Sequence, residues 1–340
     1  MTIDIKDMMV IDALELSKWD RDFVVMLQKG GVKCVHACVG LWENARETLT
    51  KVAEWHRFFA DHNDLVMAVK TGEDIATAKR IGKLGIILGA QNTSALEDEL
   101  GLVSVFNQLG VKIMQLTYNN QNLVGSSCYE ETDPGLSRYG KNVIAEMNRV
   151  GMVIDLSHVG NKTSLDTLAL SSRPVAITHA NPDWIYPTKR NKSEEILTAL
   201  RDNKGVLGVC AYPHLINGAG TTLEEFCDMI ARTADFMGID HIGIGTDLTH
   251  NMSVDFLAWM RMGRWTHEIE YGAGSKENPG WPDWPEWFQT PLDFPNIVQG
   301  LSARGMTFDE ISKIMGGNWY RFFDEGFKAQ KELVTCVSLT

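Results

Sequence analysis

The stretch GMVIDLSHVGNKTSLDTLALSSRPVAITHA, residues 151–180, contains two short apolar runs on either side of a more polar segment. The runs, at 152–158 and 174–180, are bounded by Gly or Pro and are rich in β-branched residues, which is typical of buried strands. The segment between them opens with Asn and has the length of a short helix. The stretch therefore predicts a strand, a helix and a second strand parallel to the first, because parallel strands need a crossover connection.

The same alternation extends along almost the whole chain. Further strands are expected at 8–14, 32–38, 85–91, 112–118, 206–212 and 241–247. Eight strands, most of them followed by helical segments, are typical of a (β/α)₈ TIM barrel, and their near-continuous apolarity fits strands covered on both faces. A doubly wound open sheet is the alternative, but no G-x-G-x-x-G follows the first strand to support a dinucleotide site.

The chain is interpreted as one barrel domain spanning residues 1–340, with additions after the eighth strand. A Trp-rich excursion is expected at 259–295, since residues 259–288 hold five of the ten Trp with Gly and Pro between them. These Trp either pack or form a subunit contact, or they build an aromatic wall over a pocket. Helical patterns then resume, and C-terminal helices are expected at 296–328.

Composition and charge narrow the choice of partner. The 340 residues carry a formal net charge of -12, which disfavours nucleic acid because phosphate binding depends on Lys and Arg. A small molecule is the expected partner. The start of the chain, MTIDIKDMMV, has neither a basic region nor a long apolar run, so neither a signal peptide nor a membrane span is expected and the protein is predicted to be cytoplasmic. Six Cys follow no C-x-x-C spacing typical of zinc sites.

Reacting groups in such barrels come from the carboxyl ends of several strands, which meet at one mouth. The strand ends supply Leu14, Leu16, His36, Gln91, Tyr118, His158, His179, Tyr212 and Asp247. Two His and one Asp from three strands are of a type that binds zinc or a similar divalent ion. The structural alternatives are a hydrogen-bonded polar His, an Asp that caps a turn and a packed Tyr. By strand alternation, His36 should face the same way as its Cys neighbours two residues away.

Several motifs together carry a resemblance to a known family. VIDLSH with AITHA, then Arg190 and Asn191, then IGIGTD, resemble the membrane dipeptidase (renal dipeptidase) family, peptidase family M19. LGVKIMQLTYN, GLSRYGKNVIAEMNRVGMVIDLSH and MGGNWYRFF extend the likeness in order along the chain. The resemblance implies an amidohydrolase-like (β/α)₈ barrel that hydrolyses dipeptides with two zinc ions.

The resemblance also implies roles for individual residues. His158 and His179 match the ligands of the second metal, and Asp247 matches the acidic residue that accepts and donates a proton beside the first metal. Arg190, with Asn191 beside it, matches the basic position that binds the substrate carboxylate, a role suited to a planar guanidinium. Tyr118 stands where the family has a His that contacts the reacting carbonyl, and is expected to contact substrate and take part in catalysis.

Other positions depart from the family pattern. The family motif D-G-H-x-D reads DALEL here, which places Leu14 and Leu16 at the two ligand positions of the first metal, and Gln91 replaces the bridging Glu. Too little anionic charge then remains for two dications, since desolvating an uncompensated ion costs several kcal/mol. One divalent metal, with zinc the first choice, or no metal is expected. Its ligands would be His158 and His179, with Gln91 or Asp247 as further candidates.

The sequence is compatible with three functions. The first is a hydrolase acting on a small amide or dipeptide-like substrate that carries a carboxylate. The second is an isomerase, lyase or decarboxylase on the same barrel, with or without metal. In it Asp247, Tyr118 and one His act as acid and base on a small carboxylate, and an apolar floor raises the pKa of the Asp247 carboxyl. The third is an inactive binding module. No nucleic acid or membrane partner is expected. The chain is expected to form a homodimer.

Overall fold

The computed structural model describes residues 4–264 and 275–330, and these residues contain a sheet of nine strands, all paired in parallel. The strands are β1 (Ile11–Glu15), β2 (Cys34–Gly40), β3 (Val66–Val69), β4 (Leu84–Ala90), β5 (Val111–Gln115), β6 (Val153–Asp155), β7 (Ala176–Ala180), β8 (Val206–Val209) and β9 (Ile242–Ile244). Eight of them close into a ring because β1 pairs with both β2 and β9, while β2 also pairs with β4. The predicted barrel is confirmed, and the open-sheet alternative is wrong.

All eight predicted strands are present, and the ninth, β3, was not predicted. It pairs with the first half of β4 and lies outside the closed ring. β3 is four residues long and only its two end residues are fully buried. Such a short, half-buried strand lacks the long apolar run that marks the others, and it follows directly on a long helix.

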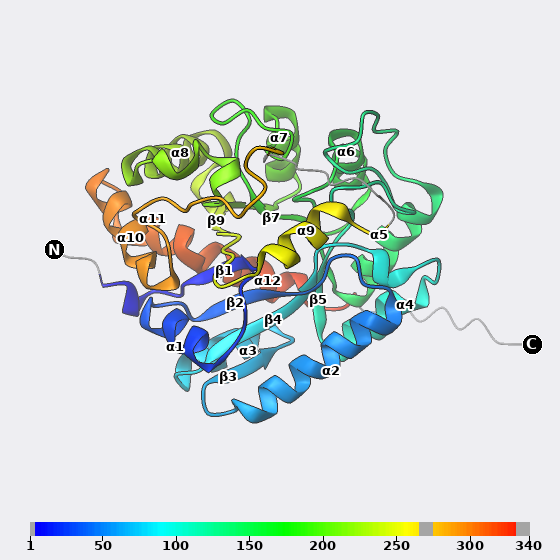
Figure 1. The fold of residues 1–340 in the computed structure, drawn as a ribbon, viewed down its shortest axis with the longest axis horizontal. Coiled ribbons are helices and arrows are strands. Elements are labelled where there is room, and N and C mark those ends of the chain that lie inside the picture. The colour runs from blue at the N-terminus through cyan, green and yellow to red at the C-terminus, as the bar shows by residue number, and fades with distance from the viewer. Residues whose placement is uncertain (1–3, 265–274, 331–340) are drawn as a thin grey trace, which may run out of the picture.

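Helices surround the ring (Figure 1). They are α1 (Arg21–Lys29), α2 (Ala45–Asp61), α3 (Gly72–Arg80), α4 (Gly101–Leu109), α5 (Arg138–Val150), α6 (Asn161–Leu170), α7 (Glu194–Asp202), α8 (Leu223–Met237), α9 (Val254–Met262), α10 (Phe294–Ala303), α11 (Phe308–Ser312) and α12 (Asn318–Gly326). Local sequence fixes where many of them begin: Asn44 and Thr222, for example, form reciprocal caps with a Glu three residues later. α9 passes in front of the strands in Figure 1.

The end of the barrel formed by the strand starts is closed by aromatic side chains of α12. Trp319 is fully buried among strand residues such as Ile11 and Val206, which stand at or near the start of their strands. Its indole N–H donates to the carbonyl of Ile244 at 3.0 Å, and its ring stacks on Phe323 with centroids 5.2 Å apart. This end is therefore filled, which leaves the opposite end for a site.

Replacing Trp319 with Ala is expected to lower the free energy of unfolding by about 3–5 kcal/mol, because it leaves a cavity that the rigid strands cannot fill. Equilibrium unfolding in denaturant measures this difference. Leu123→Ala is the matched control, since Leu123 is 58% exposed and surface truncations usually change stability by less than about 0.5 kcal/mol. A loss below about 1 kcal/mol for Trp319→Ala would show that α12 does not close the barrel, since core truncations of this kind cost more.

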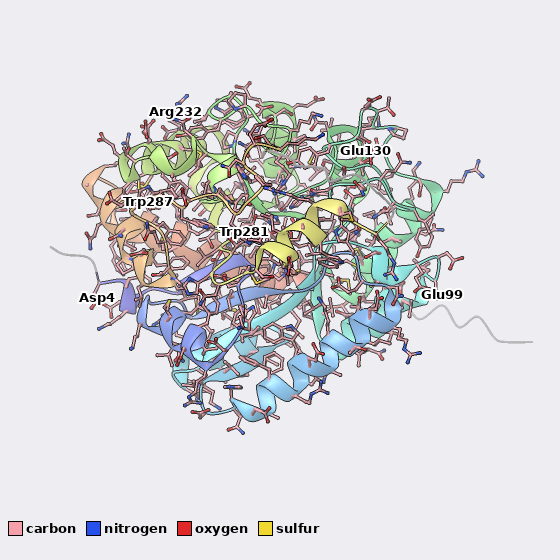
Figure 2. All side chains as sticks on the ribbon, viewed as in Figure 1. Asp4, Glu99, Glu130, Arg232, Trp281 and Trp287 are labelled. Atoms are coloured by element: carbon pink, nitrogen blue, oxygen red, sulfur yellow. The ribbon has the colours of Figure 1, made fainter. Side chains whose placement is uncertain are left out.

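The Trp-rich segment divides between the two predicted roles, and two of its Trp, Trp281 and Trp287, are labelled in Figure 2. Trp287 packs on Phe226 of α8 with ring centroids 4.8 Å apart, and Trp284 contacts Tyr212 edge-on at 5.9 Å. Trp281 instead lines the cavity described below. Trp265 lies outside the described residues, and the predicted subunit contact stays a prediction. Across residues 4–264 and 275–330, no helix combines the length and apolarity needed to cross a bilayer.

Candidate active site

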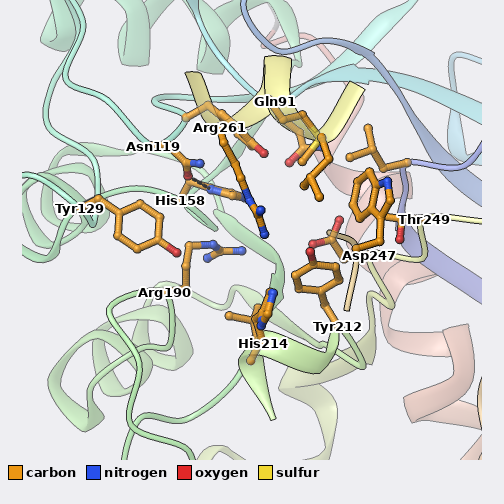
Figure 3. A pocket seen from close by; sticks show the side chains of 16 residues that line it. Gln91, Asn119, Tyr129, His158, Arg190, Tyr212, His214, Asp247, Thr249 and Arg261 are labelled. Atoms are coloured by element: carbon orange, nitrogen blue, oxygen red, sulfur yellow. Dashed lines mark hydrogen bonds between the residues drawn. The ribbon is translucent and has the colours of Figure 1, made fainter. Parts of the chain in front are cut away.

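A cavity of about 600 Å³, including part of its open mouth, lies at the carboxyl ends of the strands (Figure 3). Its lining residues come from loops after several strands and from α9. They are Leu16, Gln91, Tyr118, Asn119, Tyr129, His158, Arg190, Tyr212, His214, Leu215, Asp247, Thr249, Leu257, Met260, Arg261 and Trp281. The location is the one where barrels of this kind place their chemistry.

Asp247, just after β9, is the carboxylate in this lining. Its backbone adopts a left-handed conformation with φ of +57°, which is uncommon outside Gly but tolerated by Asp. Its N–H donates to the carbonyl of Leu14 at 3.2 Å. Burial raises the pKa of Asp247 to about 7, and the positive charge of Arg190 acts in the opposite direction. An acid with this pKa can both take up and release a proton near neutrality.

Arg190 enters the cavity from the loop after β7. It is 3% exposed, and its guanidinium donates to the carbonyls of His179, at 3.0 Å, and Ser157. These two strand-end carbonyls fix the plane of the guanidinium while its head group points into the cavity (Figure 3). A guanidinium has five N–H donors, so an anchored Arg190 can still bind a carboxylate.

His158 and His179 lie side by side with their Nε2 atoms 3.1 Å apart. His158 Nδ1 is 2.7 Å from the amide oxygen of Asn119, which can only accept, so this nitrogen carries the proton. His179 Nδ1 is 2.8 Å from the hydroxyl oxygen of Thr178, whose own hydrogen goes to the carboxylate of Asp155 at 2.7 Å. His179 Nδ1 is therefore also a donor, and both Nε2 atoms present lone pairs to the same point.

Burial lowers the pKa of both imidazoles well below the usual range, and the charge of Arg190 lowers it further. Both rings are therefore neutral at pH 7, and the two Nε2 atoms do not share a proton. Two converging imidazole lone pairs, each ring held through its other nitrogen, are the arrangement in which a protein presents His to a metal ion.

The end of β1 is apolar on the side of the cavity. Leu16 lines the cavity and packs with Trp42 and Tyr118, and Leu14 is fully buried. Gln91, just after β4, also lines the cavity, and its side-chain N–H₂ has no hydrogen-bond partner. Within the described residues, no group of three or more His, Cys, Asp or Glu is arranged to hold a metal.

Tyr118 lies where the sequence predicts it, at the cavity wall. It is 3% exposed, and its ring centroid is 4.3 Å from that of His158. Burial raises the pKa of Tyr118 well above its usual value, and the charge of Asp247 raises it further. The phenol is therefore protonated at neutral pH and can donate a hydrogen bond into the cavity.

Two other predicted candidates do not line the cavity. The Asn191 amide oxygen accepts from the N–H of Asn181, and its N–H₂ donates to the carbonyls of Tyr186 and Leu215. Its amide is thus used to hold the loop that carries Arg190. His36 is fully buried, and its Nδ1 lies 2.7 Å from the carbonyl of Ala13. Burial lowers the pKa of His36 to about 4, so it is a neutral residue of the barrel interior.

Some lining residues were not predicted. Arg261 comes from α9, and Tyr129 and His214 come from loops after β5 and β8. Tyr212, by contrast, was expected at the mouth as the end of a predicted strand, and it lines the cavity. For Arg261 the sequence offers no signal, because α9 follows an irregular segment whose path depends on tertiary packing.

The closed parallel barrel with its cavity at the strand ends makes the protein a (β/α)₈ barrel with its site where barrel enzymes place theirs. Residues 18–258 match the model of the membrane dipeptidase family, peptidase family M19. The match covers more than half of the chain, and the protein belongs to this family.

Individual relatives agree with this assignment. The chain is 26% identical to dipeptidase tcpJ of Claviceps purpurea over 82% of its own length and 60% of that protein. It is 31% identical to the uncharacterized dipeptidase C965.12 of Schizosaccharomyces pombe over 59% of its length and 50% of that protein. It thus spans 50–60% of the length of these curated relatives. A crystal structure of an amidohydrolase from Pseudomonas aeruginosa superposes with a TM-score of 0.88 at 38% identity, covering 95% of this chain and 98% of that one.

Proposed function

We propose that this protein hydrolyses the amide bond of a small dipeptide-like substrate that carries a carboxylate. The observation that carries the proposal is the pairing, in one buried cavity, of Asp247, whose pKa is about 7, with the anchored guanidinium of Arg190. Membership of the M19 family, whose relatives include proteins named dipeptidases, supports the same reaction class.

In this proposal Arg190 binds the substrate carboxylate and thereby places the amide beside Asp247. Ionised Asp247 takes a proton from the attacking water, and the water oxygen bonds to the amide carbon. Asp247 then gives that proton to the departing nitrogen as the C–N bond breaks, which yields a carboxylic acid and an amine. The acid then passes its remaining proton to the amine, so that a carboxylate and an ammonium group leave. Tyr118, protonated at neutral pH, donates a hydrogen bond to the carbonyl oxygen as it gains negative charge.

The lone pairs of His158 and His179 fit one divalent ion, and zinc is the first choice for two imidazoles. A bound ion of this kind would supply a water of lowered pKa. A second ion does not fit, because Leu14 and Leu16 offer no donor atoms and Gln91 offers an amide in place of a charge. We therefore propose a single-metal site, with Gln91 or Asp247 as further ligands.

Hydrolysis is tested with dipeptides bearing L- or D-residues at the C-terminal position, in water enriched in ¹⁸O. Release of both amino acids with one ¹⁸O atom in the new carboxylate is the expected result. The matched control is the same dipeptide with its C-terminal carboxylate converted to an amide. Its kcat/KM should be about 10- to 100-fold lower, because Arg190 then has no anion to bind.

A second candidate function is proton transfer without hydrolysis, as in an isomerase, lyase or decarboxylase. It is favoured by the absence of a three-ligand His, Cys, Asp or Glu group from the described part of the chain. Asp247 and Tyr118 would then exchange protons with a small carboxylate. Turnover with no ¹⁸O in the products would support this reaction and contradict hydrolysis. If no dipeptide or small carboxylate were turned over, the barrel would be a binding module.

A further inference from the structure

The cavity has an apolar side that the proposed reaction does not use. Four of the lining residues form this side, which we call the apolar wall: Leu16, Leu257, Met260 and Trp281. We propose that the apolar wall binds the side chain of the substrate's N-terminal residue, so that the preferred substrate carries a branched or aromatic apolar side chain there. This inference rests on the proposed function and names its substrate class.

The apolar wall is one connected surface. Leu16, Leu257 and Met260 belong to one cluster of buried apolar side chains, and Trp281 packs against that cluster. Leu257 and Met260 are three residues apart on α9, so they lie on the same face of the helix. Because all four residues also line the cavity, an apolar ligand group that contacts them leaves water, which is favourable in proportion to the area covered.

Two hydrogen bonds hold the apolar wall in place. The indole N–H of Trp281 donates to the carbonyl of Ser253, the residue that caps the start of α9, at 3.0 Å. The indole N–H of Trp42, after β2, donates to the carbonyl of Met260 at 3.1 Å. The ring of Trp42 also contacts Tyr118 edge-on, with centroids 5.3 Å apart. The loop after β2 and the segment around Trp281 therefore both fix the position of α9.

The apolar wall lies across the barrel from the residues that anchor Arg190. In the closed ring β1 and β6 face each other, since three strands separate them in either direction. Leu16 follows β1, whereas Arg190 donates to the carbonyl of Ser157, which follows β6. Asp247 follows β9, the neighbour of β1. Figure 3 shows Arg190 and Asp247 on different sides of the cavity.

This order sets the direction of the substrate. With the carboxylate on Arg190 and the amide beside Asp247, the part of the substrate beyond the amide extends toward β1 and α9. In a dipeptide that part is the N-terminal residue. Its side chain therefore meets Leu16 and Leu257, while the side chain of the C-terminal residue stays on the side of Arg190.

The test compares two ligands that cannot be hydrolysed, because a methylene group stands where a dipeptide has its amide nitrogen. Levulinate has a methyl group beyond its ketone, and its isobutyl analogue has an isobutyl group in that place. Isothermal titration calorimetry on the full chain is expected to give a Kd for the isobutyl analogue about 10- to 50-fold lower than for levulinate, since three further carbon atoms leave water. Equal affinities, or no binding of the isobutyl analogue, would overturn the inference.

Variants assign the preference to the apolar wall. Leu257→Asn keeps the shape of the side chain and is expected to lower the levulinate-to-analogue Kd ratio by about 3- to 10-fold, because the analogue then meets an amide. Leu257→Met, which keeps an apolar side chain of similar volume, should keep the ratio. Val254→Thr is the matched control, because Val254 lies on the same helix, is 60% exposed and is not among the cavity lining.

Binding of levulinate shows that a variant retains a folded cavity. If Leu257→Asn does not bind it, Met260→Gln gives the same comparison at a more exposed position of the apolar wall. A ratio that stays at the wild-type value in a folded Leu257→Asn or Met260→Gln would overturn the assignment.

The two proposals can fail separately. If the isobutyl analogue is preferred and no dipeptide is hydrolysed, the apolar wall stands as a binding subsite and the proposed hydrolysis fails. If dipeptides are hydrolysed, Leu-D-Ala should exceed Asn-D-Ala in kcat/KM by about 10-fold or more, because the two side chains differ in polarity and not in shape. Equal values for this pair would overturn the substrate class while leaving hydrolysis in place.

Discussion

Replacing Asp247 with Asn is expected to lower kcat by about 10²- to 10⁴-fold, the usual contribution of a positioned acid or base. The amide of Asn keeps the shape of the carboxyl but cannot accept a proton from water. The left-handed backbone at this position also tolerates Asn, so the loss should come from chemistry and not from unfolding. Steady-state kinetics with the best dipeptide found, together with a thermal unfolding curve for each variant, measures both effects.

The pH dependence of the wild type gives an independent test. As a base, Asp247 must be ionised, so kcat/KM should rise as pH increases through about 7 and then level off, following its raised pKa. If the base were an exposed carboxyl, kcat/KM would level off near pH 4–5 instead. Arg190 lowers the pKa of Asp247, so Arg190→Met should move the rise of kcat/KM to higher pH. A profile that falls through this range would instead indicate that Asp247 must be protonated.

Asp255→Asn is the matched control for both measurements. Asp255 lies in the first turn of α9 and is exposed, so its loss should change neither kcat nor the pH profile. If Asp247→Asn retained more than about a tenth of wild-type kcat, Asp247 would not exchange the proton, since positioned acids and bases contribute more than this.

The barrel was predictable because of a simple physical constraint. Parallel strands are covered on both faces, so they give uninterrupted apolar runs, and eight such runs stand out from the amphipathic helices between them. β3 was missed because this constraint does not apply to it: it pairs outside the ring and two of its four residues are only partly buried. The extra strand leaves the barrel closed and does not move the site.

The site was predictable to the extent that strand ends define it. His158, Gln91, Tyr118 and Asp247 reach the cavity because the carboxyl ends of parallel strands meet there. His179 is not among the lining residues, and it contacts two that are, His158 through its ring and Arg190 through its carbonyl. Arg261 could not be predicted, because its position depends on the path of the chain between β9 and α9 and on its bond to Pro279. No pattern in a single sequence reports such a path.

The second prediction with a large expected effect concerns metal binding by the imidazoles of His158 and His179. Protein purified without chelator is expected to contain about one divalent ion per chain, and His179→Ala is expected to contain almost none, because two imidazoles are the strongest neutral donors in the cavity. Activity should fall by about 10²-fold or more with the loss of the ion, because the water that it polarises then keeps its ordinary pKa. Elemental analysis of the purified protein measures the first effect, and steady-state kinetics measures the second.

Thr178→Val separates the role of the pair from simple loss of a ligand. The Thr178 hydroxyl accepts a hydrogen bond from His179 Nδ1–H and donates one to the carboxylate of Asp155. These two bonds fix the tautomer of His179 in which Nε2 carries the lone pair on the side of His158. Val keeps the shape but removes this bond, and metal affinity should fall by about 10- to 100-fold. His56→Ala, at an exposed position on α2, is the control and should keep the ion.

Two ions per chain would show that Leu14, Leu16 and Gln91 do not limit the site. Full activity without any ion would show that the two lone pairs serve another purpose and that Asp247 works alone.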